Sequence, residues 1–265
     1  MSSRRLLLSE TTLQTRIFFR TAVAAFFTLV LPLMFLVMIN FFVPDEPGSD
    51  TPVSQYITPA LAVFGMVTAT FTNLAINTSM ARDEGILKRV AGTPLPMATH
   101  LGGRIASATL VGLLSVALML LVGWLLFDVE IIWSAMPTFA LLLILGAGTF
   151  SALGLAVAAL TPSARAAPAI ANFVVLPLAF ISGVFFPLDN APEWLQTVAG
   201  LLPLEPLATA AIDVFNDALV GFPTGALVSL LLWGGVGLAV ALRFFSYEPS
   251  EGGRSRRRPE AQTSS

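Results

Sequence analysis

Few side chains in this chain of 265 residues could carry out covalent chemistry. It has no cysteine, one histidine and a single lysine, which excludes thiol catalysis and cysteine metal sites. His100 stands beside Arg104, far from Ser182, so a serine nucleophile and its base would not meet. No glycine-rich run precedes Lys88, as a Walker A phosphate-binding loop requires. We therefore predict that the chain is not an enzyme and binds neither metal nor cofactor.

Charged side chains of both signs gather instead in one short segment, 82–89. Carboxylates are favoured at the start of a helix and cations at its end, and Glu84 and Lys88 have the spacing that stabilises a helix. The pattern predicts a compact helix over about 82–92 that begins at Asp83 and Glu84. Its apolar side chains would be available to a partner: Ile86, Leu87 and Val90.

The composition places this segment in a membrane protein. Hydrophobic residues make up 55% of the chain and charged residues 11%, and the mean hydropathy is +0.82. Soluble domains have about 25% charged residues, so most soluble enzymes and nucleic-acid binders are excluded. A helix needs about 20 apolar residues to cross a bilayer, and an all-α protein with six transmembrane helices is predicted. They cover 21–43, 55–81, 105–127, 131–164 (from near Pro137), 166–188 and 218–242 (apolar from Gly225).

The distribution of basic residues predicts the orientation. The loops 44–55, 128–136 and 189–221 contain no lysine or arginine, whereas all 14 basic residues lie on the other side or at its boundary. Lysine and arginine concentrate on the cytoplasmic side of membrane proteins. Both termini are therefore expected in the cytoplasm of a bacterium, with the protein in its plasma membrane.

Two segments flank the predicted transmembrane domain, 21–245. Residues 1–20 favour an amphipathic helix on the cytoplasmic membrane surface, with Leu13, Ile17 and Phe18 in the membrane and arginines facing anionic headgroups. The tail 246–265 is rich in Gly, Arg and Ser, and we expect it to be disordered.

The loop between the last two spans contains apolar runs that are too short to cross the membrane. We expect re-entrant or interfacial helices over about 188–206, with Trp194 at the headgroup level. An amphipathic helix over 207–219 would then lead into the last span.

Two sets of motifs resemble those of a known family. The cytoplasmic segment 81–96 reads ARDEGILKRVAGTPLP, and the outer segments read ISGVFFPL (181–188), PEWL (192–195) and LPL (202–204). Together they resemble the membrane subunits of ABC-2 type transporters, the exporter permeases that include the daunorubicin-resistance type. The resemblance covers almost the whole chain.

The resemblance implies a type V exporter fold. Two six-span subunits would pair as a homodimer or heterodimer, each with a cytosolic ATPase that binds ATP and Mg. The N-terminal helix would be an interface helix. The coupling helix would use Arg82, Asp83, Glu84, Gly85, Leu87, Lys88 and Arg89, and the outer re-entrant gate Ser182, Gly183, Phe186, Pro187, Pro192, Trp194, Leu195 and Pro203.

The function expected from this resemblance is export of a hydrophobic or amphiphilic substrate, such as a drug or a lipid. The alternative is a passive channel or a membrane scaffold that has no ATPase partner. Co-purification of an ATPase would separate the two.

Overall fold

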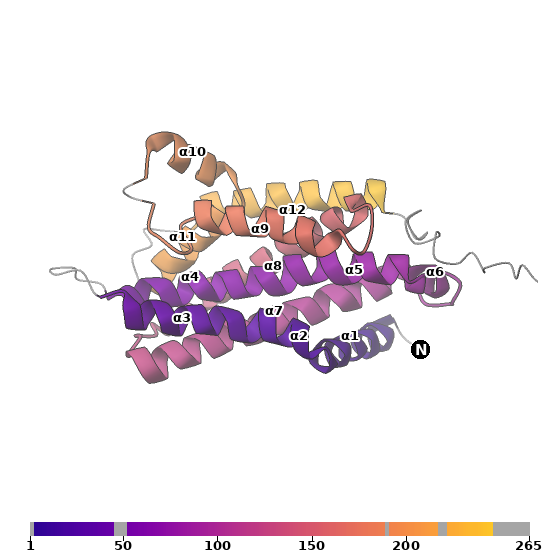
Figure 1. Ribbon diagram of the computed structural model, residues 1–265, viewed down its shortest axis with the longest axis horizontal. Helices are drawn as coiled ribbons and strands as arrows, with labels where there is room; N and C mark the ends of the chain where they lie inside the picture. The colour runs from indigo at the N-terminus through magenta and orange to yellow at the C-terminus, as the bar shows by residue number, and fades with distance from the viewer. Residues whose placement is uncertain (1–2, 45–51, 189–190, 217–221, 246–265) are drawn as a thin grey trace, which may run out of the picture.

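The computed structural model describes residues 3–44, 52–188, 191–216 and 222–245. These residues form helices and connecting loops without a strand, as the composition predicts. The predicted tail 246–265 and the predicted start of the last span lie outside them. The long helices run along one long axis (Figure 1). The helices have these bounds: α1 Ser3–Arg20, α2 Ala22–Ala25, π-helix η1 Phe26–Val30, α3 Leu31–Phe42, α4 Val53–Val67, π-helix η2 Thr68–Thr72, α5 Asn73–Asp83, α6 Ile86–Ala91, α7 Met97–Phe127, α8 Met136–Leu160, α9 Ala167–Ile181, α10 Glu193–Leu201, α11 Leu204–Phe215 and α12 Thr224–Phe244.

Within the described residues, four helical segments are long and apolar enough to cross a membrane. They are Val53–Asp83 (α4, η2 and α5 in continuation), α7, α8 and α12, and the bent pair of α10 and α11 could count as a fifth. The predicted start of the fourth span near Pro137 agrees with the first residue of α8, and the predicted apolar part of the sixth span, from Gly225, begins next to the first residue of α12. The count of six spans stays a prediction, since Phe26–Phe42 and α9 are shorter.

The fifth predicted span, 166–188, is wrong at its outer end. Helix α9 stops at Ile181 after 15 residues, a length of about 22 Å against about 30 Å of hydrocarbon. The chain turns at Gly183, whose φ of 72° a side chain would oppose. The helix therefore ends where the glycine permits a turn.

Helix α8 lies at the centre of the packing, against α12, α5, η2 and α11. Small residues allow these helices to approach closely. A Cβ atom added to Gly154 would lie 2.6 Å from the carbonyl oxygen of Phe71 in η2, and one added to Gly237 of α12 would lie 2.8 Å from the backbone nitrogen of Leu153. The Thr149 hydroxyl of α8 also donates a hydrogen bond to the Leu230 carbonyl of α12, at 2.9 Å.

The segment between α9 and α12 folds back into the bundle. Helices α10 and α11 meet at 94°, and α11 packs against α4, α8 and α12 with most of its side chains buried. The predicted division into a re-entrant part (188–206) and a separate helix (207–219) is therefore wrong. The bend falls at Leu202–Pro203, and the inward arm is α11 itself.

Two glycines of α8 offer a matched test of this packing. Gly154→Ala places a methyl group against the Phe71 carbonyl, and we expect it to destabilise the protein by about 1–3 kcal/mol. Gly148→Ala meets no atom within 4 Å and should be neutral or slightly stabilising, because alanine favours helix. Thermal unfolding in detergent measures both, and equal melting temperatures would contradict the close approach.

Candidate functional site

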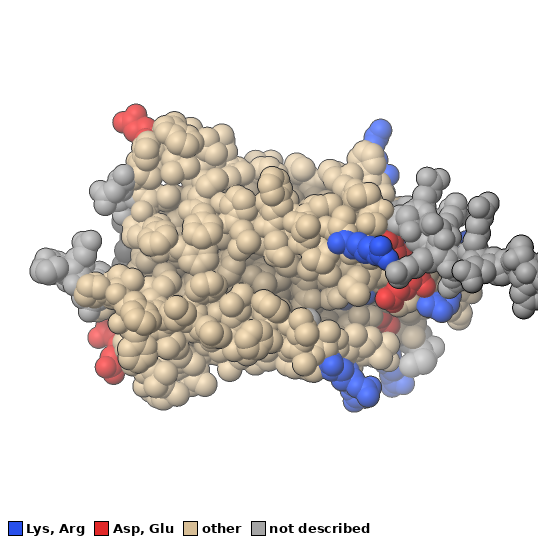
Figure 2. Space-filling view, viewed as in Figure 1, with Lys and Arg blue, Asp and Glu red and all other residues tan. Residues whose placement is uncertain are grey.

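The short helix α6 lies at the end of the molecule where lysine and arginine gather (Figures 1 and 2). It is separated from α5 by Gly85, whose φ of 71° ends one helix and allows the next to begin in a new direction. The prediction of one helix that starts at Asp83 and Glu84 is therefore wrong. Asp83 is the last residue of α5 and Glu84 is its C-cap, so Glu84 and Lys88 do not share a helix.

The Arg82 and Asp83 side chains point into the protein and hold the α8–α9 link. Arg82 is 6% exposed and donates hydrogen bonds to the carbonyl oxygens of Ala158 (3.0 Å) and Thr161 (2.6 Å). Asp83 accepts one from the Ala164 backbone N–H at 2.6 Å, and its Oδ1 lies 3.5 Å from Nε of Arg82. These two residues therefore hold the end of α8 and the turn before α9. We call the contacts the lower tie.

The exposed face of α6 is basic. Lys88 and Arg89 are exposed, Ile86 and Val90 are half-buried, and Leu87 is fully buried at 0% exposure. The prediction that Leu87 is available to a partner is therefore wrong. It anchors α6 to its own chain because a fully buried leucine gains about 1.5–3 kcal/mol over an exposed one.

Helix α1 packs along the first turns of α7 through a polar seam. Oε1 of Glu10 lies 2.8 Å from Nδ1 of His100, and both residues are buried. Gly103 makes room, since a Cβ atom there would lie 2.4 Å from Cγ of Glu10. One turn further, the hydroxyls of Thr15 and Ser107 share a hydrogen bond of 2.8 Å. The seam holds α1 against the bundle.

This seam was not predicted, although α1 has a single acid among its basic residues and α7 begins with a glycine pair. The expectation for α1 is partly wrong, because Phe18 packs with Ala69 and Val111 inside the protein. Leu13 and Ile17 are exposed. So are the four arginines of this helix: Arg4, Arg5, Arg16 and Arg20.

At the end of the molecule opposite to α6, the first turn of α4 holds three connecting segments. The Tyr56 hydroxyl donates a hydrogen bond to the Gly183 carbonyl beyond α9, which we call the upper tie. The Gln55 amide exchanges two bonds of 3.0 Å with the backbone of Glu130, and Asn216 after α11 donates to the Gln55 carbonyl at 3.4 Å. Neither Gln55 nor Tyr56 was predicted as a site residue.

The residues predicted for the outer gate do not form one cluster. Ser182 and Gly183 are buried in the turn after α9, and Pro203 is buried at the bend before α11. Trp194 is 67% exposed and Leu195 is half-buried on α10. The remaining three are exposed: Phe186, Pro187 and Pro192.

An aromatic cluster forms around Phe185, which the sequence reasoning missed in favour of Phe186. Its ring lies 5.9 Å from that of Phe35, 5.4 Å from that of Phe64 and 5.0 Å from that of Phe180. Three helices, α3, α4 and α9, therefore meet at this ring. The contacts with Phe35 and Phe64 are edge-to-face and the one with Phe180 is tilted, and aromatic pairs add about 0.5–1.5 kcal/mol each to the packing.

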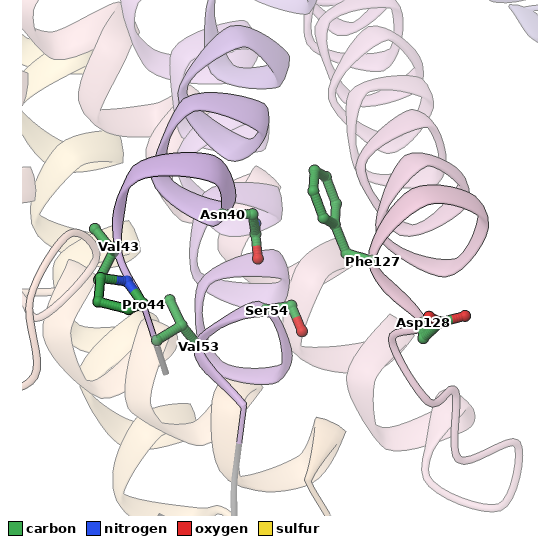
Figure 3. A pocket seen from close by; sticks show the side chains of 7 residues that line it. All are labelled: Asn40, Val43, Pro44, Val53, Ser54, Phe127 and Asp128. Carbon is green, nitrogen blue, oxygen red and sulfur yellow. The ribbon is translucent and has the colours of Figure 1, made fainter. Parts of the chain in front are cut away.

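A hollow of about 250 Å³ opens where the C-terminal ends of α3 and α7 meet the first turn of α4 (Figure 3). Ligand pockets measure about 300–1,000 Å³, so this hollow is below the usual size of a substrate site. Within the described ranges, no three histidine, aspartate or glutamate side chains come close enough to hold a metal ion. The hollow is lined by Asn40, Val43, Pro44, Val53, Ser54, Phe127 and Asp128.

Comparison with known proteins gives a consistent result. The family model described as ABC-2 type transporter matches residues 5–216. The putative transport permease YvfS of Bacillus subtilis is 23% identical over 209 residues, which cover 77% of this chain and 82% of YvfS. The inner membrane transport permease YadH of Escherichia coli K12 is 27% identical over 154 residues, 57% of this chain and 58% of YadH. Nodulation protein J of Rhizobium leguminosarum bv. trifolii is 36% identical over 74 residues, 28% of this chain and 27% of that protein.

The α1–α7 seam can be tested by removing its carboxylate. Glu10→Ala leaves the buried His100 without its partner, and we expect a loss of about 1–3 kcal/mol of stability with faster hydrogen exchange in α1. Ser9→Ala, at an exposed position of the same helix, should change neither. Thermal unfolding and hydrogen exchange measure the effect, and unchanged exchange in Glu10→Ala would show that the pair does not hold α1.

Proposed function

Because the chain belongs to the ABC-2 type transporter family, a family of membrane transport permeases, we propose that it is the membrane subunit of an ATP-driven exporter. It would work with a separate cytosolic ABC ATPase, which binds ATP and Mg, and with a second permease subunit. Its substrate would be hydrophobic or amphiphilic. The protein would be located in the bacterial plasma membrane.

Helix α6 is the observation that carries this proposal. It is a six-residue helix between two long apolar segments, and its own chain holds it by the buried Leu87 and by the lower tie. A force applied to α6 would therefore move α5 and the α8–α9 link, because these segments are held together and do not form a loose loop. The ATPase would press on α6 when it binds ATP.

The charges of α6 indicate what kind of partner surface it fits. Arg82 and Asp83 interact with each other and with the backbone of the α8–α9 link, so the exposed charges are Lys88 and Arg89 against Glu84. We propose that Lys88 and Arg89 contact an acidic groove of the ATPase. Complementary potentials of this kind mainly give specificity and speed of association.

The spans support ATP as the energy source. No Asp, Glu, Lys or Arg lies within 21–43, 55–81, 105–127, 131–164, 166–188 or 225–242. Ion-coupled transport relies on ionisable residues inside the membrane. A substrate with a large apolar part would fit such a surface better than an ion would.

We also propose an orientation and an outer gate. In Figure 2, lysine and arginine are visible at the end that contains α6, whereas acids alone are visible among the charged residues at the opposite end. By the positive-inside rule the α6 end is cytoplasmic, and both termini would lie there. The turn at Ser182–Gly183 with Phe186 and Pro187, and α10 with Pro192, Trp194, Leu195 and Pro203, would close the outer side.

The orientation can be tested directly because the chain contains no cysteine. Single cysteines at the exposed positions Glu130, Phe186 and Thr93 are offered an impermeant thiol reagent in intact cells. Glu130→Cys and Phe186→Cys should be labelled, and Thr93→Cys should react only after the membrane is opened. Labelling of Thr93→Cys in intact cells would reverse the proposed orientation.

The contact of α6 with the ATPase can be tested by charge reversal. The double variant Lys88→Glu, Arg89→Glu should weaken ATPase binding by about tenfold or more, since like charges then face each other. Arg243→Glu makes the same type of change at an exposed residue in the last turn of α12 and should bind normally. Titration of the ATPase onto the permease in lipid nanodiscs measures both, and equal affinities would remove α6 from the interface.

A further inference from the structure

The lower tie joins the ends of two helices that the sequence separates from α5 by more than 70 residues. Arg82 donates a hydrogen bond to the carbonyl of Ala158. This carbonyl lies in the last turn of α8, where the helix itself offers no donor. The Asp83 carboxylate accepts a hydrogen bond from the N–H of Ala164, in the turn that leads into α9. Neighbouring residues at the end of α5 therefore hold both sides of the link between α8 and α9.

The lower tie is buried, which makes it stiff. The Arg82 and Asp83 side chains are 8% and 13% exposed, so water competes little for their hydrogen bonds. The Thr161 N–H and hydroxyl both bond to the Val157 carbonyl, and this keeps the acceptor Thr161 in place. Displacement of the α5 end would therefore pull the start of α9 with it.

The same two segments are joined again at their outer ends. Tyr56, in the first turn of α4, forms the upper tie with Gly183, two residues beyond α9. Since α4, η2 and α5 form one continuous helical segment, this segment and α9 are held to each other at both ends. They also pack side by side along α5 and η2.

We propose that Arg82 and Asp83 are positioning residues that transmit movement of α6 to α9, and through α9 to the turn at Ser182–Gly183. The proposal rests on the function proposed above, in which the ATPase moves α6. It gives Arg82 and Asp83 a role different from that of Lys88 and Arg89: they carry motion within the permease and do not contact the ATPase.

The first measurement needs no partner. Spin labels on Lys88→Cys and Pro168→Cys, both exposed, report the distance between α6 and the start of α9 in the purified chain in phospholipid vesicles. The distribution should be narrow in the wild type and in Asp83→Asn, whose amide oxygen can still accept the Ala164 N–H. It should broaden in Asp83→Ala. Glu84→Ala, which removes an exposed neighbouring carboxylate, is the control and should stay narrow.

The second measurement adds the purified ABC ATPase that co-purifies with the wild-type chain. Labels on Phe180→Cys, in the last turn of α9, and Trp124→Cys, near the outer end of α7, report the response of the outer side to ATP. The wild type and Asp83→Asn should show a shift in distance. Asp83→Ala should bind the ATPase with unchanged affinity, and the fraction of shifted molecules should fall by about tenfold.

The outcomes separate the two proposals. An Asp83→Ala chain that keeps both the narrow distribution and the full outer shift overturns the transmission role, as does a loss of ATPase affinity equal to that of the Lys88→Glu, Arg89→Glu variant. If no ABC ATPase binds the wild-type chain, the exporter proposal fails. Broadening of the distance distribution in Asp83→Ala would still show whether the lower tie joins α6 to the start of α9. If Asp83→Ala does not fold, Arg82→Lys, which replaces the two guanidinium nitrogens that bond Ala158 and Thr161 with a single ammonium, takes its place with the same expectations.

Discussion

A helix in or near a membrane leaves up to four amides without partners at its first turn and up to four carbonyls at its last, and lipid cannot satisfy them. In this protein, side chains from distant parts of the chain bond one of those helix-end carbonyls, that of Ala158, and backbone groups in the links beyond other helix ends. Arg82 and Asp83 do so at the α8–α9 link, Tyr56 at the turn after α9, and Gln55 at the loop before α8. Most of these side chains belong to the segment Val53–Asp83, which is also largely buried. That segment therefore determines where the other helix ends lie.

Close backbone contact is the second requirement, because a bilayer gives apolar helices little reason to associate. Helix α8 meets it through Gly154 against η2, while Gly237 of α12 approaches α8 from another side. At Gly154 the neighbouring backbone is a π-helix, in which the carbonyls are spread by the extra residue in the turn. Backbone contacts around α8 and hydrogen bonds from α4 and α5 therefore stabilise the same helix bundle, at different positions along its length.

The sequence was sufficient for the features that depend on local composition. Apolar windows predicted the all-helical membrane fold and the starts of α8 and α12, and the motifs predicted the family. It was insufficient where a single backbone angle determines where a helix ends, or where a long-range contact determines whether a side chain is buried. Gly85 divides the predicted helix at 82–92 because its φ is positive. Leu87 and Arg82 look available in the sequence, yet the fold buries them, and the Glu10–His100 contact joins residues that only tertiary structure brings together.

The burial of Arg82 also changes the electrostatic account of the end of the molecule that contains α6. In the sequence, the segment 82–89 has two acids and three bases, which indicates a nearly neutral surface. Burial of Arg82 and Asp83 as a mutually compensated pair removes one charge of each sign from the surface. The pair is costly to desolvate and gains its stability from the backbone groups that it satisfies. The charged side chains that stay exposed on α6 are Lys88 and Arg89. The contacts that hold the helix ends in place therefore also leave α6 with a basic surface.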